Sequence, residues 1–263
     1  MAGILIATAV IAVCGILVGV GLVFFGRKFH VDVDERVLAV RELLPGNNCG
    51  ACGYAGCDAM AAAIASGEAP VNGCPVGGAS CAEKIGEVMG VSADAAEKKV
   101  AYVRCNGSCE HTAIKANYTG ISDCRSAVAS GISMWSCDFG CMGYGSCVKV
   151  CPAHAITVVD GVAVVDPDKC VACGLCVKTC PKALIELIPY DQKTFVRCRN
   201  TNRGPQVKNI CAVGCIGCRL CTKQCETGAI TVTDNLAHID TALCTNCGKC
   251  AEKCPTKAIN VRK

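Results

Sequence analysis

The chain of 263 residues contains 27 cysteines, and many of them stand only two or three residues apart. Three runs share the complete spacing C-x2-C-x2-C-x3-C. They are Cys170, Cys173, Cys176 and Cys180; Cys215, Cys218, Cys221 and Cys225; and Cys244, Cys247, Cys250 and Cys254. Closely spaced thiolates are metal ligands, and this spacing is the bacterial ferredoxin signature for [4Fe–4S] binding. The cysteines therefore predict a protein that moves electrons.

The pairing of the runs follows from what such a cluster needs. A cluster of this kind is held by four thiolates, and one short C-x2-C-x2-C loop supplies three of them. In two-cluster ferredoxins the fourth comes from the last cysteine of the other run, so two runs fold as one unit. The last two runs of the chain predict such a unit. Its expected ligand sets are Cys215, Cys218, Cys221 with Cys254, and Cys244, Cys247, Cys250 with Cys225.

An internal repeat predicts another two-cluster unit just before this one. The intervals from Cys198 through Cys211, Cys215 and Cys221 to Cys225 recur from Cys124 through Cys137, Cys141 and Cys147 to Cys151. In this register Tyr144 stands where the later unit has Cys218, so one ligand is missing. We expect Cys137 to replace it, and a three-ligand [3Fe–4S] cluster is the alternative. The expected sets are Cys137, Cys141, Cys147 with Cys180, and Cys170, Cys173, Cys176 with Cys151.

A different cysteine pattern precedes the repeat. Cys49, Cys52 and Cys57 have C-x2-C-x4-C spacing, and Cys74 follows sixteen residues after the last of these. The glycines between them let the backbone turn N–H groups toward the sulfurs of an anionic cluster. The alanine-rich stretch 58–66 is expected to be helical and to carry the chain to the fourth ligand. These four cysteines predict one more [4Fe–4S] site.

Five further cysteines lie near the repeated units, namely Cys105, Cys109, Cys124, Cys198 and Cys211. Four of them are enough for an additional cluster. The preferred set is Cys105, Cys109 and Cys124, completed by Cys198 or Cys211, and free buried thiols are the alternative. The sequence thus predicts five [4Fe–4S] clusters, with a sixth left open. For Cys81, on an expected helix over residues 79–89, we expect a packing role.

Other uses of the cysteines fit the spacing less well. Secreted disulfide scaffolds are usually short and do not use tight x2-x2-x3 arrays. Zinc ribbons normally use two separated C-x2-C pairs, so the third thiolate of each run has no place in them. Charged residues make up 18% of the chain and the net charge is +4, so no nucleic-acid partner is implied. Nucleotide-binding glycine motifs and nucleophile–base arrangements are missing, so we expect no catalytic residues.

The N-terminal segment from Gly3 to Gly26 contains neither a charge nor a proline. Its length suffices to cross roughly 30 Å of hydrocarbon as a helix, so a single transmembrane span is predicted. A cleavable signal peptide is the rival interpretation, but no basic region precedes the apolar run. Arg27 and Lys28 follow the segment, and by the positive-inside rule they predict that the rest of the chain is cytoplasmic.

The elements around the cysteines indicate an α+β fold. The segments 155–166 and 229–240 alternate around Asp-Gly and Asp-Asn turns, which is typical of β-hairpins. A helix is expected over residues 34–44. The predicted organisation is a transmembrane anchor over 1–26, a small helical [4Fe–4S] domain over 27–90, a cysteine-containing connector over 91–133, and tandem two-cluster bacterial ferredoxin-like units over 134–190 and 191–263.

The apolar segment, the motif NCGACGYAGC with its distant GCP, and the ferredoxin runs resemble the B subunits of Rnf complexes, the ion-translocating ferredoxin:NAD oxidoreductases. The resemblance implies a subunit of a translocase that relays electrons from reduced ferredoxin toward NAD, with coupled Na⁺ or H⁺ translocation. It implies a location at the bacterial cytoplasmic membrane. The implied partners are soluble ferredoxin, the lipid bilayer, and the membrane and flavin-bearing subunits. The second ferredoxin unit departs from the shorter family members.

Two other functions remain open. One is a polyferredoxin subunit of another membrane-bound oxidoreductase, and the other is a structural zinc-binding anchor protein. Lysines beside the cysteine runs also predict attraction of an acidic electron carrier, although a solvated face explains them equally well. These lysines are Lys149, Lys178, Lys223, Lys249 and Lys253.

Overall fold

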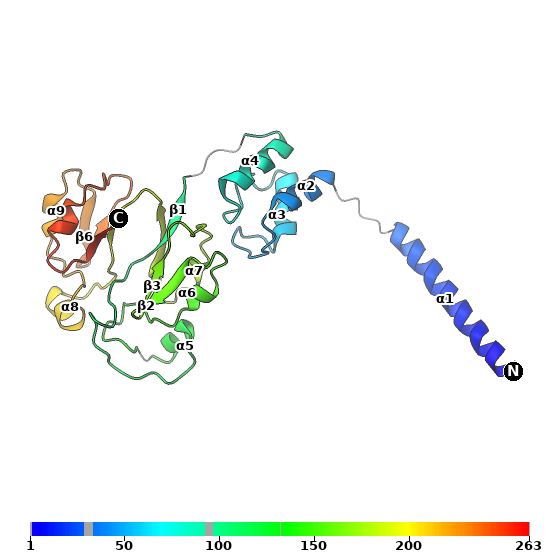
Figure 1. Cartoon of the computed structure of the whole chain (residues 1–263), viewed down its shortest axis with the longest axis horizontal. Coiled ribbons are helices and arrows are strands. Elements are labelled where there is room, and N and C mark those ends of the chain that lie inside the picture. Colours follow the sequence, from blue (N-terminus) through cyan, green and yellow to red (C-terminus); the bar gives the residue numbers. More distant parts are fainter. Residues whose placement is uncertain (1, 29–33, 93–96, 132, 263) are drawn as a thin grey trace.

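The computed structural model describes residues 2–28, 34–92, 97–131 and 133–262. Its elements follow one another along the longest axis, from an N-terminal helix through a small helical domain to two α+β units (Figure 1). Every sheet has only two strands, and the helices of the α+β units are short. Each α+β unit buries a small apolar cluster that includes several cysteines, so we expect bound metal centres to contribute to the folding free energy.

Helix α1 (Ala2–Lys28) forms where the apolar run predicts a helix. Among the residues that the structure describes, however, no helix combines the length and the hydropathy needed to cross a membrane. The predicted transmembrane span is therefore wrong on this finding. The fold class is corrected to α+β with an N-terminal helix.

The small helical domain consists of α2 (Glu35–Leu43), α3 (Cys57–Ala65) and α4 (Gly78–Met89). These helices confirm the predictions for residues 34–44, 58–66 and 79–89. Val40, Met60, Ile64 and Ile85 are almost completely buried where the three helices meet. The sequence of alanines and larger apolar residues on α3 is what allows this close packing. The domain therefore has an apolar core of its own beside its cysteines.

The first ferredoxin-like unit contains two antiparallel strand pairs. β1 (Lys99–Val103) pairs with β4 (Ile185–Pro189), and β2 (Ile156–Val159) pairs with β3 (Val162–Val165) as the predicted hairpin. Its helices are α5 (Cys124–Ala129), α6 (Ser146–Lys149) and α7 (Leu175–Thr179). Because β1 completes a sheet with β4, we propose that this unit includes residues that were expected to form a separate connector.

The second unit repeats the same order of elements. β5 (Thr194–Val196) pairs with β8 (Ile259–Val261), and β6 (Ile230–Thr233) pairs with β7 (Leu236–Ile239) as the other predicted hairpin. Its helices are α8 (Gly204–Ile210), α9 (Leu220–Gln224) and α10 (Lys249–Glu252). The strand β5 therefore occupies in the second unit the position that β1 occupies in the first.

The equivalence of β1 and β5 extends to the residues that follow them. Both strands continue into the tripeptide Val-Arg-Cys. The backbone N–H of Arg104 donates to Leu184 O at 2.8 Å, and that of Arg197 donates to Ala258 O at the same distance. Each acceptor lies just before the partner strand of its unit. Cys105 and Cys198 are therefore structurally equivalent residues.

The two units pack directly against each other. The ring of Tyr102 stacks on that of Phe195 with 4.5 Å between the ring centroids. The backbone N–H of Ala212 in the second unit donates to His111 O in the first at 3.0 Å. The Arg199 guanidinium also donates to Lys182 O at 3.0 Å. These contacts bring cysteines of the two units toward a common boundary.

Candidate iron–sulfur sites

The helices of the cysteine runs begin in the same way. The residue before α7 is Gly174 with φ +74°, and the residue before α10 is Gly248 with φ +75°. A left-handed residue turns the loop sharply into the helix, and glycine adopts this conformation without steric cost. The turn allows cysteines on the loop and on the first helical turn to face one cavity. The three cysteines of a C-x2-C-x2-C run can therefore surround one cavity.

In the second unit, one cavity is lined by Cys215, Cys218, Cys221 and Cys254, with an empty volume of about 340 Å³. These are the four cysteines that the sequence predicts for one cluster. For the other predicted set, burial raises the pKa of Cys250 to about 11, and the nearby thiols of Cys244 and Cys247 raise it further. The loop cysteines of that run therefore also lie close together.

In the first unit, the corresponding cavity is lined by Cys124, Cys141, Cys147 and Cys180, with an empty volume of about 430 Å³. Burial raises the pKa of Cys147 to about 12, and the thiols of Cys141, Cys124 and Cys180 add to this rise. Cys137, the predicted fourth ligand, does not line this cavity. We therefore propose Cys124 as the fourth ligand in its place.

The local structure explains how Cys124 reaches this cavity. Asp123 begins α5 as its N-cap, and its carboxylate accepts from the backbone N–H groups of Arg125 and Ser126 at 2.9 and 3.0 Å. Ser146 donates to the same carboxylate at 2.7 Å and accepts from Cys124 N at 2.8 Å. Tyr144 packs against Cys124 in a small buried cluster. Cys124 is thus fixed beside the residue that replaces the missing cysteine.

The remaining predicted set of the first unit also lies together. Burial raises the pKa of Cys176 to about 12, with further contributions from the thiols of Cys173, Cys170, Cys147 and Cys151. Backbone N–H groups point at two of these sulfurs. Ala101 N donates to the sulfur of Cys170 at 3.3 Å, and Ala155 N donates to that of Cys151 at 3.3 Å. Such N–H···S contacts stabilise negative charge on the sulfur.

In the helical domain, three of the four predicted cysteines influence one another. Burial raises the pKa of Cys74, and the thiols of Cys52 and Cys57 add to the rise. Asn48 accepts from Cys57 N at 2.8 Å and so holds the start of α3 against the loop. The thiol of Cys49, the fourth predicted ligand, contributes to the raised pKa of Cys173, for which burial is the largest cause. The helical domain thus presents Cys49 toward the first ferredoxin-like unit.

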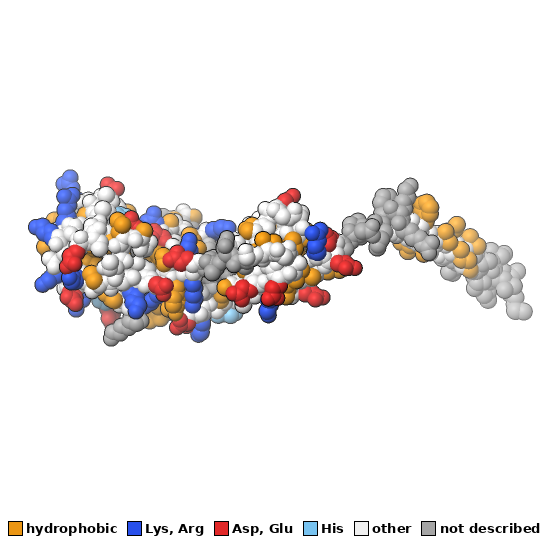
Figure 2. Space-filling view, turned by 90° about the horizontal axis from the view of Figure 1, so that it is seen from above, with side chains coloured by type: hydrophobic (Ala, Val, Ile, Leu, Met, Phe, Trp, Pro, Cys, Tyr) orange, Lys and Arg blue, Asp and Glu red, His pale blue; other side chains and the backbone are white. Residues whose placement is uncertain are grey.

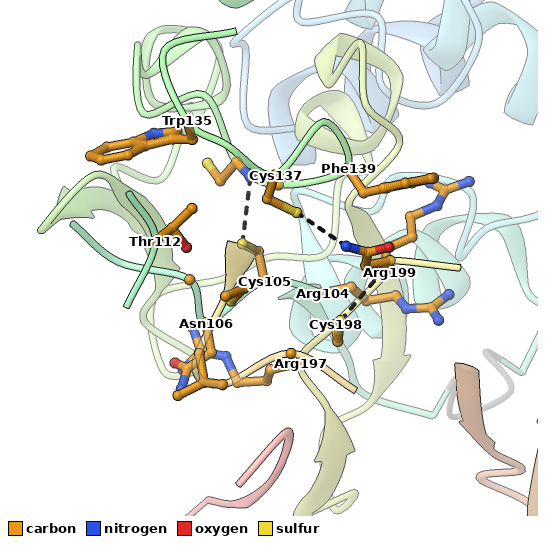
Figure 3. Close-up of a pocket in the computed structure, with 17 residues that line it drawn as sticks. Arg104, Cys105, Asn106, Thr112, Trp135, Cys137, Phe139, Arg197, Cys198 and Arg199 are labelled. Atoms are coloured by element: carbon orange, nitrogen blue, oxygen red, sulfur yellow. Dashed lines mark hydrogen bonds between the residues drawn. The ribbon is translucent and has the colours of Figure 1, made fainter. Parts of the chain in front are cut away.

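A third cavity lies where the two units meet, and we call it the joint cavity. Among its lining residues are Cys105, Cys137, Cys198 and Cys211, and its empty volume is about 420 Å³. Figure 3 shows three of these residues, Cys105, Cys137 and Cys198, around the same space. Of the five extra candidates from the sequence, Cys109 is exposed and lines none of the three cavities, and Cys124 belongs to the first unit.

Two other cysteines have different surroundings. Cys81 is buried in the core of the helical domain, and its thiol donates to Leu43 O at 3.2 Å. This arrangement agrees with the packing role expected for it. Cys14 is exposed on α1.

The chemistry of the donor sets fits [4Fe–4S] clusters. All cysteines are free thiols, so each cavity offers unbridged sulfur ligands. In the described part of the chain, no group of three or more His, Cys, Asp or Glu side chains is placed to hold a metal ion. A single zinc ion draws four sulfurs to about 2.3 Å from one point, whereas a cubane keeps them apart by its own width. Thiols around a shared empty space suit a cubane cluster better than a single zinc ion.

The fold and these cysteine cavities define an iron–sulfur protein of the ferredoxin class. Comparison with protein families agrees. A family described as "Putative Fe-S cluster" matches residues 44–76, and a "4Fe-4S dicluster domain" matches residues 136–184 and 214–258. The matches support an Fe–S cluster in the helical domain and [4Fe–4S] clusters in both tandem units.

Curated relatives identify the family more closely. The chain is 45% identical to the B component of the Na⁺-translocating ferredoxin:NAD⁺ oxidoreductase complex of Acetobacterium woodii, over 90% of this chain and 72% of the relative. It is 43% identical to the B component of the ion-translocating oxidoreductase complex of Methanosarcina acetivorans, over 88% of each chain. The proton-translocating counterpart of Clostridium ljungdahlii is 38% identical, over 89% of this chain and 83% of the relative.

The chain belongs to this family of Rnf-type B subunits. It is an iron–sulfur electron-transfer subunit of an ion-translocating ferredoxin:NAD⁺ oxidoreductase complex, and hence part of a translocase. The resemblance drawn from the sequence is confirmed.

Proposed function

We propose that this subunit receives electrons from soluble reduced ferredoxin at its second ferredoxin-like unit and delivers them through the first unit to the helical domain. The observation that carries this proposal is the succession of neighbouring thiols. Cys147 of one site adds to the raised pKa of Cys176 of the next, after burial, and Cys49 does the same for Cys173. Neighbouring sites therefore follow one another from the first unit into the helical domain.

The residues of the chain perform three tasks in such a relay. When bound, a [4Fe–4S] cluster takes up one electron and later releases it. The cysteines of each cavity hold the iron, and the backbone N–H groups of residues such as Ala101 and Leu184 stabilise negative charge on the sulfurs. Burial of Cys147 and Cys176 excludes water. The chain therefore supplies position and electrostatics and needs no catalytic side chain.

The second unit has the features of an entry surface. Cys218 and Cys247 are exposed, whereas most other cysteines of the tandem units are buried or half-buried. Lys223 and Lys253 are exposed beside these runs. Figure 2 shows Lys and Arg side chains standing out at the end of the molecule opposite α1. A basic surface around accessible ligands favours docking of an acidic electron carrier.

Charge reversal tests the entry surface. In the double variant Lys223→Glu/Lys253→Glu, reduction by ferredoxin is expected to slow at low salt, because attraction becomes repulsion. Lys178→Glu, beside a run of the first unit, is the matched control and is expected to keep the normal rate. The measurement is stopped-flow reduction of the assembled complex at several salt concentrations. A wild-type rate that does not fall with salt, or an equal effect of Lys178→Glu, contradicts docking at the second unit.

We further propose that the subunit works at the bacterial cytoplasmic membrane with membrane-embedded and flavin-bearing partners. The names of the relatives support this, because they describe ion-translocating complexes and an ion can only be translocated across a membrane. Those names differ in the ion, Na⁺ in one and H⁺ in the other. The test is purification of the tagged chain from gently solubilised membranes. Recovery of a flavin-containing complex supports the proposal, whereas recovery with a hydrogenase or another reductase favours the alternative of a different oxidoreductase.

A further inference from the structure

Five cysteines line the joint cavity, three from the first unit (Cys105, Cys137 and Cys141) and two from the second (Cys198 and Cys211). Cys141 also lines the cavity inside the first unit, which leaves two cysteines of each unit for the joint cavity alone. Cys105 follows β1 and Cys198 follows β5, so these two are equivalent through the repeat. Cys137 and Cys211 likewise each stand four residues before the first cysteine of their unit's run. The joint cavity thus resembles the ferredoxin sites in its supply of thiols.

Three of these four sulfurs are withdrawn from water, and three receive hydrogen bonds. Cys105, Cys198 and Cys211 are only 7–8% exposed. Cys141 N donates to the sulfur of Cys105 and Asn200 N to that of Cys198, each at 3.4 Å. The Asn200 side-chain amide reaches the sulfur of Cys137 at 3.7 Å (Figure 3). N–H donors aimed at sulfur are a recurring feature of iron–sulfur sites, because the bound sulfurs carry negative charge.

A buried donor in the wall of the cavity has no partner. The hydroxyl of Thr112 lacks a hydrogen bond, although this residue is only 4% exposed. Buried polar groups in proteins are nearly always hydrogen-bonded. An acceptor inside the cavity, such as the sulfide or thiolate sulfur of a bound cluster, would satisfy it. This unpartnered donor is independent of the cysteines and points to the same ligand.

The backbone around the cavity agrees with an anionic occupant. A Cβ atom added at Gly107 would lie 3.3 Å from the sulfur of Cys211 and 2.8 Å from the hydroxyl of Thr112. The backbone therefore approaches the sulfurs closely only because this residue is glycine. Arg104, Arg197 and Arg199 also line the cavity, but the Arg104 guanidinium pairs with Glu186 at 2.8 Å and that of Arg199 donates to Lys182 O. An anionic occupant is therefore supported by the close backbone and the N–H donors, and not by these arginines.

We propose that Cys105, Cys137, Cys198 and Cys211 in the joint cavity bind an additional [4Fe–4S] cluster, with two ligands from each ferredoxin-like unit. The proposal rests on the proposed function, since it extends the same electron relay. It differs from the set expected from the sequence, because Cys109 and Cys124 are left out and Cys137 joins Cys105 together with both Cys198 and Cys211. The cluster would tie the two units together covalently and would supply a one-electron carrier between them.

The position of the cavity explains why the relay needs such a site. Cys105 accepts a hydrogen bond from Cys141, a cysteine of the neighbouring cavity in the first unit. On the other side, burial raises the pKa of Cys198 to about 11, and the thiol of Cys215 in the second unit contributes to this rise. The joint cavity is thus adjacent to one ferredoxin site of each unit. It therefore lies between the two predicted cluster sites of the first unit and the two of the second.

The first test removes one ligand. Cys211→Ala is expected to lower the iron content from about 24 to about 20 atoms per chain, with a matching loss of acid-labile sulfide. Cys109→Ala is the matched control, because this exposed cysteine lines none of the three cavities, and it is expected to keep all the iron. Both proteins are purified without oxygen for metal analysis and EPR. Wild-type protein with about 20 irons, unchanged in Cys211→Ala, overturns the joint site and leaves the relay function standing. Protein without any iron overturns the proposed function itself.

A second test does not depend on ligand removal. Thr112→Val keeps the shape of the side chain but removes its hydroxyl, so iron content is expected to stay the same. The potential of one cluster signal is expected to fall, because a hydrogen bond to the cluster is lost. Thr119→Val, at an exposed residue of the same segment, is the control. EPR-monitored redox titration compares the proteins. If no signal in Thr112→Val moves relative to Thr119→Val, the cavity holds no cluster.

Discussion

Replacement of Cys124 by alanine is the most direct test of how the first unit compensates for Tyr144. In the structure Cys124 shares a cavity with Cys141, Cys147 and Cys180, whereas Cys137 lies in the joint cavity. Removing Cys124 therefore leaves three ligands for one cluster. We expect a loss of about one iron atom if a [3Fe–4S] cluster persists, and of about four if the whole cluster is lost. All other sites should remain filled.

The double variant Cys124→Ala/Cys137→Ala shows by its iron content whether the two cysteines serve the same cluster. If the two cysteines serve different clusters, the double variant loses the sum of the two single losses, up to about eight of about 24 iron atoms. If both cysteines serve one cluster, the double variant loses no more than about four. The assay is anaerobic iron and sulfide analysis of all three variants, normalised to protein by amino-acid analysis.

A rescue variant sharpens the same experiment. Tyr144 occupies the register position of Cys218 and packs against Cys124. In Cys124→Ala/Tyr144→Cys the missing ligand is returned to its position in the repeat, so the iron lost in Cys124→Ala is expected to reappear. Tyr144→Phe in the Cys124→Ala background is the control and should not restore iron. Full iron content in Cys124→Ala alone would refute the assignment of Cys124.

Three further predictions concern stability and metal content. Asp123→Ala removes the N-cap of α5 and should lower the free energy of unfolding of the iron-loaded protein by about 1 kcal/mol. Asp123→Asn keeps a capping side chain and should be nearly neutral. Denaturant unfolding measures the stability of both variants. Ile64→Ala leaves a cavity between α2, α3 and α4 and should lower the free energy of unfolding by about 2–5 kcal/mol. The helical domain should then unfold at a lower temperature and lose the iron of its own site alone. Loss of iron from the tandem units as well would contradict an independent core. Removal of iron by a chelator should abolish amide-exchange protection of the hairpins β2–β3 and β6–β7 while α2 to α4 keep part of theirs. The reason is that the buried clusters around the hairpins include several cysteines of the proposed sites, whereas the buried residues described for the cluster of α2 to α4 include one cysteine, Cys81. Protection of all three regions in iron-free protein, or stoichiometric zinc in place of iron, would contradict the metal-dependent fold.

The cysteine runs were predictable because they are local. Three ligands of each regular site lie within seven residues of one another, and a short loop before a helix can only place them around one space. The hairpins at 156–165 and 230–239 were equally visible as alternating segments around tight turns. The helices of the N-terminal domain followed from alanine-rich periodicity. For all these features, chain connectivity already limits the structure strongly.

The repeat register and the strand pairing assign different equivalents to Cys198. Equal intervals align Cys124 with Cys198, but the structure makes Cys105 the equivalent of Cys198. The segment between β1 and the first run is longer in the first unit than the corresponding segment after β5, and α5 begins within it. The recurring tripeptide Val-Arg-Cys at 103–105 and 196–198 is the signal that could have shown this. Equal spacing there is a coincidence that only strand pairing reveals.

The sequence by itself determined that thiolates hold iron here, that the sites come in tandem pairs, and which family the chain belongs to. These conclusions depend on residue types and short spacings, which survive in any conformation. Only the tertiary structure brought together cysteines from distant segments, such as Cys124 with Cys141, Cys147 and Cys180 in the first unit and the cysteines that line the joint cavity. Their proximity results from β1 pairing with β4 and from the packing of one unit on the other, and no local pattern encodes such contacts.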